Sequence, residues 1–414
     1  MHNSLNILIV CEHASSRFGG EAMLPLNYFR LLSQTSHTAY LITHERVRQS
    51  LEELEDLDHD KIFYIPDTKF HKILHKLSQM LPHRISIVTF GALMHLLTQY
   101  YQRKLAKCVV LEKEIDVIHE PAPVSATQPS AMFGLNTPVI IGPMNGGMTF
   151  PQAFSHMSGR VEKLIYSSIR IVSTGLNLLL PGKRNADLLL VANKRTELAL
   201  PKFLKGKIAE VVENGVFNIK SHPSVRDKGE TIKVIYVGRL VDWKCVDIAI
   251  EAVSETKCKA HLTIIGDGSV RSALEAKVKK ENIKNVNFTG LVDHKDINNY
   301  YDDSDIFLLP SVRECGGAVV LEAMSRGLPV IATDWGGPAD YITSDTGFLV
   351  EPLSKNHMVT EFARIIDALS ANVELRHEVG LRAIERVKKH FLWDEKINTI
   401  SRYYNEVAVK KEKN

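Results

Sequence analysis

Two glutamates stand eight residues apart in the segment RECGGAVVLEAMSRGLPVIATDWGGP, which spans residues 313–338. The apolar run DIFLLPS before it predicts a strand, and AVVLEAMSRG predicts a helix that begins at Ala318. This prediction places Glu314 in the loop at the end of the strand and Glu322 about one turn into the helix. Both carboxylates then lie close to a helix start.

The predicted helix start suits an anionic group, because its free backbone amides donate hydrogen bonds to phosphate oxygens. Gly316 and Gly317 allow a ligand to approach the backbone closely. Two carboxylates would repel a phosphate unless each of them accepts hydrogen bonds from sugar hydroxyls. The segment therefore indicates a ligand that carries both a phosphate and a sugar.

Positive charge for a diphosphate is available in YVGRLVDWK, where Arg239 and Lys244 follow another predicted strand. Arginine can bind two phosphate oxygens at once, and lysine acts as a mobile point charge. The aspartate-rich stretches DHD, at 58–60, and DDSD, at 302–305, precede strands. We therefore expect the two cations and backbone amides, and no metal ion, to stabilise a leaving nucleotide.

The length and composition predict a globular protein of two domains. The chain has 414 residues, of which 44% are hydrophobic and 24% charged. A net charge of +3 is too small for a nucleic-acid binder. Five scattered cysteines without a CxxC pair argue against disulfides and zinc and favour a reducing cytosol. We expect a cytoplasmic protein without a leader or a membrane span, which touches a membrane only from the side.

Short, uninterrupted apolar runs alternate with helical segments along the chain, which is typical of parallel strands buried on both faces. The runs are LNILIV, TAYLIT, IFYIP, IDVIHE, PVIIGP, LLLVAN, IKVIYVG, HLTIIG, VNFTG, DIFLLP, PVIATD and GFLV. They predict two doubly wound, Rossmann-like α/β domains. The predicted boundaries are 1–212 and 231–394, with a linker at 213–230 and a final helix at about 395–414 that packs back on the first domain.

The order and spacing of several motifs resemble glycosyltransferase family 4, a branch of the GT-B enzymes, whose fold has two facing domains with a cleft between them. The motifs are GRL with Lys244, IGDGSVRSALE, FTG with Gly290, DIFLLPS and the paired glutamates. FGGEA, DVIHEPAP and IIGPMNGGM are similar to that family's acceptor-domain loops, so the resemblance covers nearly the whole chain.

The resemblance implies a retaining, metal-independent transfer from a UDP- or GDP-sugar to a hydroxyl of a carbohydrate or lipid-linked acceptor, without a further cofactor. Polysaccharide, lipopolysaccharide or glycolipid synthesis is the expected setting. By position, it implies catalytic roles for Glu314, His119, Arg239 and Lys244. It implies donor contacts from Arg239, Lys244, Gly290, Glu314, Cys315, Gly316, Gly317, Ala318 and Glu322. The acceptor-side loops contain Gly19, Gly20, Glu21, Asn145, Gly146 and Gly147.

Two departures from the family pattern bear on the donor sugar rather than on the reaction class. Cys245 follows Lys244 where the family commonly has glycine, and ECGG replaces the form E-x-F-G. Two other nucleotide sites are excluded, because GPMNGGMT has Met148 in place of the lysine of a phosphate loop and GDGSVR lacks the third glycine of a dinucleotide fingerprint.

Several alternatives remain open from the residues alone. His119 at a strand end also fits a satisfied structural histidine, and the glycines at 19 and 20 also fit a tight turn. The segment 161–184 fits core packing, with an interfacial membrane contact as the alternative. For the whole chain, a sugar-nucleotide 2-epimerase and a non-catalytic nucleotide-sugar binding protein are the rival functions.

Overall fold

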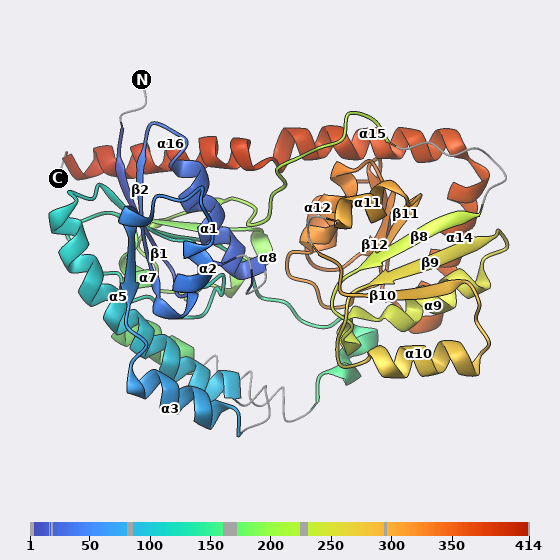
Figure 1. Cartoon of the computed structure of the whole chain (residues 1–414), viewed down its shortest axis with the longest axis horizontal. Coiled ribbons are helices and arrows are strands. Elements are labelled where there is room, and N and C mark those ends of the chain that lie inside the picture. Colours follow the sequence, from blue (N-terminus) through green and yellow to red (C-terminus); the bar gives the residue numbers. More distant parts are fainter. Residues whose placement is uncertain are drawn as a thin grey trace. The chain divides into compact units, whose positions relative to one another are not determined.

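The computed structural model describes residues 4–15, 17, 20–80, 86–159, 172–223, 231–293 and 296–412. The chain forms two compact units (Figure 1). Unit 1 comprises Met1–Gly147, Val161–Glu213 and Lys396–Asn414, and unit 2 comprises Met148–Arg160 and Asn214–Glu395. Residues 148–160 thus belong to unit 2, whereas the sequence analysis placed them in the first domain.

Unit 1 is built on a seven-stranded sheet in the order β3-β2-β1-β4-β5-β6-β7, in which every pairing is parallel. The strands are β1 (Asn6–Val10), β2 (Thr38–His44), β3 (Ile62–Ile65), β4 (Val117–Glu120), β5 (Val139–Met144), β6 (Leu188–Val191) and β7 (Lys207–Glu210). Strands β4, β5 and β6 are buried at every residue, which explains their uninterrupted apolar sequences.

The helices of unit 1 begin and end where local sequence permits. They are α1 (Gly20–Leu32), α2 (Arg48–Glu52), α3 (Lys69–Ser78), α5 (Ala92–Glu112), α7 (Gly182–Asn185) and α8 (Lys194–Ala199), with a further helical stretch at 172–179. Short 3₁₀ turns lie at η1 (Glu45–Val47), η2 (His59–Lys61) and, in unit 2, η4 (Gln152–Met157), and a π-helical turn, η3 (Ile87–Gly91), precedes α5. Thr68 caps α3, because its side chain accepts a hydrogen bond from the His71 amide.

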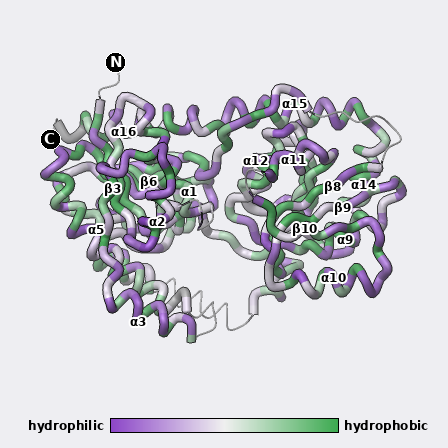
Figure 2. The backbone as a smooth tube through the Cα atoms, in the orientation of Figure 1, coloured by the Kyte–Doolittle hydropathy of each residue, from purple (hydrophilic) through white to green (hydrophobic). Residues whose placement is uncertain are grey.

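Unit 2 contains a six-stranded sheet in the order β10-β9-β8-β11-β12-β13, again with every pairing parallel. The strands are β8 (Ile232–Val237), β9 (Ala260–Ile265), β10 (Val286–Gly290), β11 (Ile306–Leu309), β12 (Val330–Thr333) and β13 (Gly347–Val350). Figure 2 shows hydrophobic residues gathered along the strands of each sheet. The two sheets confirm the predicted fold class of two doubly wound, Rossmann-like α/β domains.

Helices cover both faces of the unit 2 sheet (Figure 1). They are η5 (Asp242–Lys244), α9 (Val246–Glu255), α10 (Arg271–Lys280), α11 (Ile297–Asp302), α12 (Ala318–Ser325), α13 (Gly337–Tyr341), α14 (Lys355–Ala371) and α15 (Val373–His390). Helix α9 packs against α10 and α14, whereas α12 packs against α13 and α15. This division follows from right-handed crossovers that run outward in opposite directions from the centre of the sheet.

Helix α16 (Trp393–Glu412) begins in unit 2 and belongs to unit 1 from Lys396 onward. The Lys396 ammonium donates to the Glu213 carbonyl at 2.7 Å, and the fully buried Tyr404 lies in the core of unit 1. Among the described residues, no helix combines the length and the apolar character that a bilayer crossing requires.

Candidate functional site

The candidate site of unit 2 lies where its strand order reverses. Strands β8 and β11 are neighbours in the sheet, paired at Ile306 with Val234 and at Phe307 with Ile235, although β9 and β10 separate them in the sequence. At such a switch point the loops after the two strands diverge and leave room for a ligand. The loop after β8 carries Arg239 and Lys244, and the loop after β11 carries Glu314. The fold thus brings the two predicted loops together.

Lys244 and Glu314 form an ion pair in which the ammonium donates to Oε2 of the carboxylate. Their side chains are only 12% and 15% exposed. Burial, followed by repulsion from Arg239, lowers the pKa of Lys244 to about 8, and the nearby Cys315 acts against this shift. Lys244 is therefore charged at neutral pH.

Arg239 is exposed directly after β8 and Gly238. Its backbone carbonyl accepts a hydrogen bond from the Tyr236 hydroxyl at 3.2 Å, which fixes the start of the loop. Within the described part of the chain, its guanidinium forms no ion pair. Arg239 and Lys244 thus place two positive charges beside the Glu314 carboxylate, and such a pair of cations favours an anionic ligand.

The loop that carries Glu314 is held by close backbone contacts with the loop after β12. The Gly337 amide donates to the Glu314 carbonyl at 2.9 Å. A Cβ atom on Gly337 would lie 2.0 Å from the Gly316 carbonyl oxygen, so only glycine fits there. Gly317, with φ of 75°, precedes α12, and no side chain of the described residues caps that helix start. The glycines therefore bring the Glu314 loop and the start of α12 to one place, as a phosphate site requires.

Glu322 lies inside α12, where the hydroxyl of Tyr301 donates to its Oε2 at 3.0 Å. Tyr301 is fully buried, so this contact orients the carboxylate from inside the unit. The sequence analysis missed Tyr301 because it precedes Glu322 by 21 residues, on α11. Only the packing of α11 beside α12 could reveal the contact.

The backbone shows why glycine is common in the family at the position of Cys245. Cys245 has φ of 49° and ψ of 41°, in the left-handed region that favours glycine. For a residue with a side chain this conformation costs about 1 kcal/mol. Cys245 is buried, and burial raises the pKa of its thiol to about 12, whereas Cys315 is exposed on the Glu314 loop. Ala318 is the first residue of α12 on that loop.

Gly290 ends β10, two strands away from β8 in the sheet order. Its φ is 78°, and a Cβ atom there would lie 3.1 Å from a nitrogen of the Arg271 guanidinium. Arg271 in turn pairs with Asp267 and Glu275. The structure thus places Gly290 at the same edge of the sheet as the candidate site, but not beside Lys244.

His119 lies in the core of unit 1 and is fully buried. Its Nδ1 is 2.7 Å from the Tyr404 hydroxyl, and its Nε2 is 2.6 Å from the Gly142 carbonyl oxygen. Burial lowers its pKa to about 4, so the ring is neutral, donates to Gly142 through Nε2 and accepts from Tyr404 at Nδ1. Both nitrogens are occupied, so this conformation gives His119 a structural role in holding α16 against the sheet. The predicted contact with a donor sugar has no support in this arrangement.

The predicted acceptor-side residues occupy unit 1. Glu21, on α1, accepts a hydrogen bond from the Val124 amide at 3.1 Å, and Gly20 is the first residue of that helix. Gly19 lies outside the described residues. The Asn145 side chain donates to Glu213 at 2.6 Å.

The two glycines after Asn145 pack against α8. The Gly146 amide donates to Thr196 at 3.0 Å, and Gly147, with φ of 72°, leaves no space for a Cβ atom beside the Arg195 carbonyl oxygen. These contacts hold the segment 145–147 against α8 within unit 1.

A buried polar cluster at the end of β4 was missed by the sequence analysis. The Glu120 carboxylate accepts hydrogen bonds from Ser130 and from Gln99, the latter at 3.1 Å. The buried Lys183 ammonium donates to the carbonyls of residues 125 and 126. Burial raises the pKa of Glu120 and lowers that of Lys183 to about 7. These hydrogen bonds satisfy both Glu120 and Lys183, and the cavity beside them, about 10 Å³, has room for one water molecule.

One group of side chains in unit 1 has the types expected of a metal site. The ligand atoms of His44, Asp67 and His71 lie within 4.8 Å of one another. Arg46 already supplies a cation there, because its Nε and Nη2 donate to Asp67 at 3.1 and 2.8 Å. The His44 Nδ1 accepts from the Arg46 amide, so its Nε2 carries the proton. This protonation and the arginine both disfavour a metal ion.

Comparison with known proteins supports the predicted class for unit 2. Residues 218–386 match the family model described as "Glycosyl transferases group 1". The 2-deoxystreptamine N-acetyl-D-glucosaminyltransferase of Niallia circulans is 29% identical over 173 residues, which are 41% of this chain and 44% of that protein. Sulfoquinovosyl transferase SQD2 of Arabidopsis thaliana is 31% identical over 222 residues, or 52% of this chain and 40% of that protein. The chain thus spans less than half the length of these two relatives.

Two solved structures resemble the whole fold. Anabaena Alr3699/HepE in complex with UDP and glucose has a TM-score of 0.62 and 16% identity, over 97% of this chain and 100% of that chain. Sucrose-phosphate synthase from Thermosynechococcus elongatus has a TM-score of 0.64 and 18% identity, over 98% and 100%. With identities of 16% and 18%, the likeness to these two structures establishes the GT-B fold and nothing more specific. Membership of family 4 within that fold stays a prediction.

Proposed function

We propose that this chain is a glycosyltransferase that binds a nucleotide-diphosphate sugar in unit 2 and transfers the sugar to an acceptor hydroxyl. The observation that carries the proposal is the buried pair of Lys244 and Glu314, with Arg239 beside it, at the switch point between β8 and β11. The match of residues 218–386 to the glycosyltransferase group 1 model supports the same class of reaction.

The first step is an exchange of partners. A diphosphate brings more negative charge than Glu314, so the Lys244 ammonium leaves the carboxylate and binds the phosphate oxygens together with Arg239. The Glu314 carboxylate is then available to accept hydrogen bonds from the hydroxyls of the attached sugar. Glu322, oriented by Tyr301, is in place to accept hydrogen bonds from the ribose hydroxyls.

Stabilisation of the charge on the departing diphosphate makes the largest contribution to catalysis. As the bond between sugar and diphosphate breaks, negative charge grows on the diphosphate, and fixed cations and amides in a partly dry site stabilise it without reorganisation. Arg239 and Lys244 supply the positive charge that a metal ion supplies elsewhere, so the proposed reaction is independent of metal. The acceptor hydroxyl attacks from the side that the diphosphate leaves and gives its proton to the departing phosphate oxygen. The bond between the sugar and the acceptor oxygen thus replaces the bond between the sugar and the diphosphate, and the configuration of the sugar is retained.

The proposed donor is a UDP-sugar, with a GDP-sugar as the alternative, because a neighbour of the same fold binds UDP. The proposed acceptor is a carbohydrate or a lipid-linked glycan of polysaccharide, lipopolysaccharide or glycolipid synthesis. A thermal-shift screen across UDP- and GDP-sugars identifies the donor, because a ligand that binds only the folded state raises the melting temperature.

Turnover of two variants tests the proposal. Lys244→Ala and Glu314→Gln should abolish release of nucleotide in the presence of acceptor while the circular dichroism spectrum stays unchanged. Lys233→Ala and Glu361→Gln are matched controls, since both residues form exposed ion pairs elsewhere in unit 2, and they should turn over like the wild type. Turnover near the wild-type rate in either site variant would reject the assignment.

The rival functions can be distinguished by their turnover of the donor with and without an acceptor. An isomerase would convert a nucleotide sugar to its epimer in the absence of acceptor. A non-catalytic binding protein would bind the donor in calorimetry and release no free nucleotide with any acceptor. A transferase should show little turnover until the acceptor is added.

A further inference from the structure

Among the described residues, helix α3 packs mainly against α5 and the π-helical turn η3. The buried His71 contacts α5, where its Nε2 lies 3.4 Å from the Thr98 hydroxyl and its ring centroid 6.0 Å from that of Tyr101. Leu74 and Ser78, three and seven residues further on, are half-buried on the same side of the helix. The other residues of α3 are exposed.

Four large apolar side chains lie on the outward part of this segment. Their exposed fractions are 69% for Phe70, 54% for Ile73, 39% for Leu77 and 76% for Met80. The spacing of three and four residues aligns Phe70, Ile73 and Leu77 on one side of the helix, and Met80 follows two residues beyond its end. We call these four side chains the apolar ridge of α3. Helices of soluble proteins normally bury such a ridge against the core.

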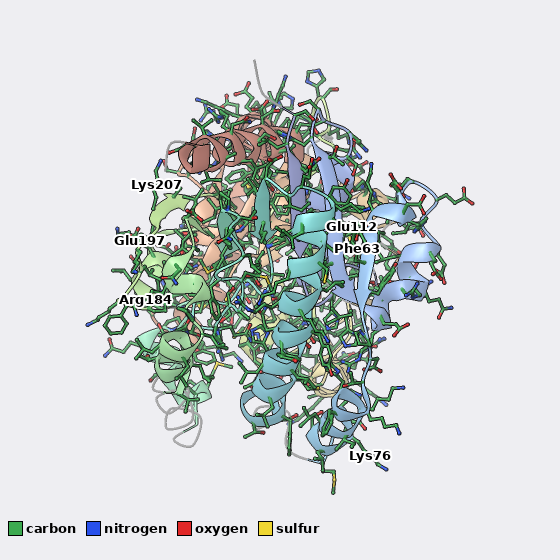
Figure 3. The ribbon with its side chains drawn as sticks, turned by 90° about the vertical axis from the view of Figure 1, so that its left-hand side faces the viewer. Phe63, Lys76, Glu112, Arg184, Glu197 and Lys207 are labelled. Atoms are coloured by element: carbon green, nitrogen blue, oxygen red, sulfur yellow. The ribbon has the colours of Figure 1, made fainter. Side chains whose placement is uncertain are left out.

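Three exposed lysines accompany the apolar ridge. Lys69, Lys72 and Lys76 lie about 90° around the helix from it, at 100° per residue. No acidic residue occurs from Thr68 to Met80, and none of the three lysines forms an ion pair with a described residue. Figure 3 shows Lys76 at the extremity of its helix, with its side chain directed into solvent. An apolar ridge thus runs beside a purely basic one.

We propose that the outward face of α3 is a docking surface for a lipid bilayer with anionic headgroups. The apolar ridge enters the boundary between headgroups and acyl chains, and the lysines remain at the level of the phosphates, where each is attracted by the negative surface. The charge pattern selects this occupant, because the charged side chains of α3 are all basic and the neighbouring Asp67 is already paired with Arg46, so the surface presents positive charge to a negatively charged partner. The surface belongs to unit 1 and shares no residue with the donor site of unit 2.

Sedimentation with vesicles tests the proposal on the purified full chain. Vesicles of phosphatidylcholine with 30 mol% phosphatidylglycerol are compared with vesicles of phosphatidylcholine alone at low and high salt. The protein should sediment with the anionic vesicles at low salt and be released by high salt. Lys72→Gln combined with Lys76→Gln should lower the partition coefficient about 25-fold, which is about fivefold for each lysine.

Substitution of apolar side chains tests the contribution of the apolar ridge. Phe70→Ser combined with Ile73→Ser should weaken binding at least about tenfold. Leu111→Ser is the matched apolar control, since Leu111 is 82% exposed near the other end of α5. Lys388→Gln combined with Lys389→Gln is the matched charge control on α15. Both controls should bind like the wild type, and all variants should keep the wild-type melting temperature.

A tryptophan at the docking face locates the contact directly. In Phe70→Trp, vesicles with brominated acyl chains should quench emission beyond the quenching of the wild-type protein. The proposal is overturned if the wild type fails to sediment with anionic vesicles, if the α3 variants bind as the controls do, or if the added tryptophan is not quenched. A concentration-dependent dimer that Phe70→Ser with Ile73→Ser abolishes would also overturn it, in favour of contact between two copies. None of these measurements requires the donor, so their failure is distinguishable from failure of the proposed transferase function.

Discussion

Replacing Lys244 by alanine should weaken UDP binding by more than the loss of one phosphate contact. The ammonium occupies a largely buried position, and its removal leaves the Glu314 carboxylate, 15% exposed, without its partner. A hydrogen bond to a charged group contributes about 1.5 to 3 kcal/mol. Repulsion between an uncompensated carboxylate and a nearby diphosphate adds about 2 to 4 kcal/mol at the effective dielectric of a protein site. The dissociation constant of UDP should therefore rise at least about 100-fold.

A second substitution should restore part of the affinity for UDP that Lys244→Ala loses. Glu314→Gln alone should bind UDP as tightly as the wild type or more tightly, because it removes the group that competes with the diphosphate for Lys244. Lys244→Ala combined with Glu314→Gln should bind UDP at least about tenfold more tightly than Lys244→Ala, because the repulsive charge is gone. Sugar transfer should nevertheless be lost in all three variants.

Isothermal titration with UDP is the appropriate assay, because free UDP lacks the sugar that Glu314 is proposed to hold. Lys233 and Asp303 form an exposed pair elsewhere in unit 2 and provide a control cycle of the same charge types. Lys233→Ala, Asp303→Asn and their combination should leave the affinity unchanged. The reasoning is refuted if Lys244→Ala binds UDP within about threefold of the wild type, or if the double variant binds more weakly than Lys244→Ala.

Three further predictions concern the loop, its glycine support and the core of unit 1. Maleimide should alkylate the exposed Cys315 and Cys108, and UDP should protect only Cys315, as peptide mass spectrometry would show, because Cys315 lies on the proposed donor loop. Gly337→Ala should lower kcat/KM at least about tenfold, since its Cβ displaces the Glu314 loop, whereas Gly175→Ala, with open space around it, should not. Urea unfolding should show stability lost as pH falls from about 6.5 to about 4, because histidines of the unfolded chain bind protons that the buried, neutral histidines of the fold do not bind. His119 contributes up to about 3 kcal/mol of this loss, so His119→Gln should make the slope less steep.

Each of these predictions has a contrary outcome. Equal protection of both cysteines by UDP would indicate a general change of accessibility rather than a ligand at the loop. Unchanged kinetics in Gly337→Ala would show that the contact between the two loops does not position Glu314. A pH slope that is as steep in His119→Gln as in the wild type would assign the acid sensitivity entirely to other groups, such as His44, whose pKa burial lowers to about 3.

The strands were predictable because their signal is local. An uninterrupted apolar run such as LLLV of β6 is buried on both faces, so its composition alone indicates a parallel strand. Strand β7, with the sequence KIAE, was missed because it is an edge strand whose side chains are mostly exposed, so its sequence carries no apolar run. The loops after the strands could likewise be singled out, since ligands of this fold class bind there.

The sequence by itself determined the two α/β domains and the chemical types present after each strand: two cations after one strand, and a carboxylate followed by glycines after another. The order of the strands in the sheets decided which of these groups become neighbours. Lys244 and Glu314 are separated by 70 residues and meet only because β11 pairs with β8. His119 is buried because Tyr404, 285 residues away, covers it from α16. No local pattern encodes such contacts, because they depend on which elements become neighbours when the apolar surface is buried.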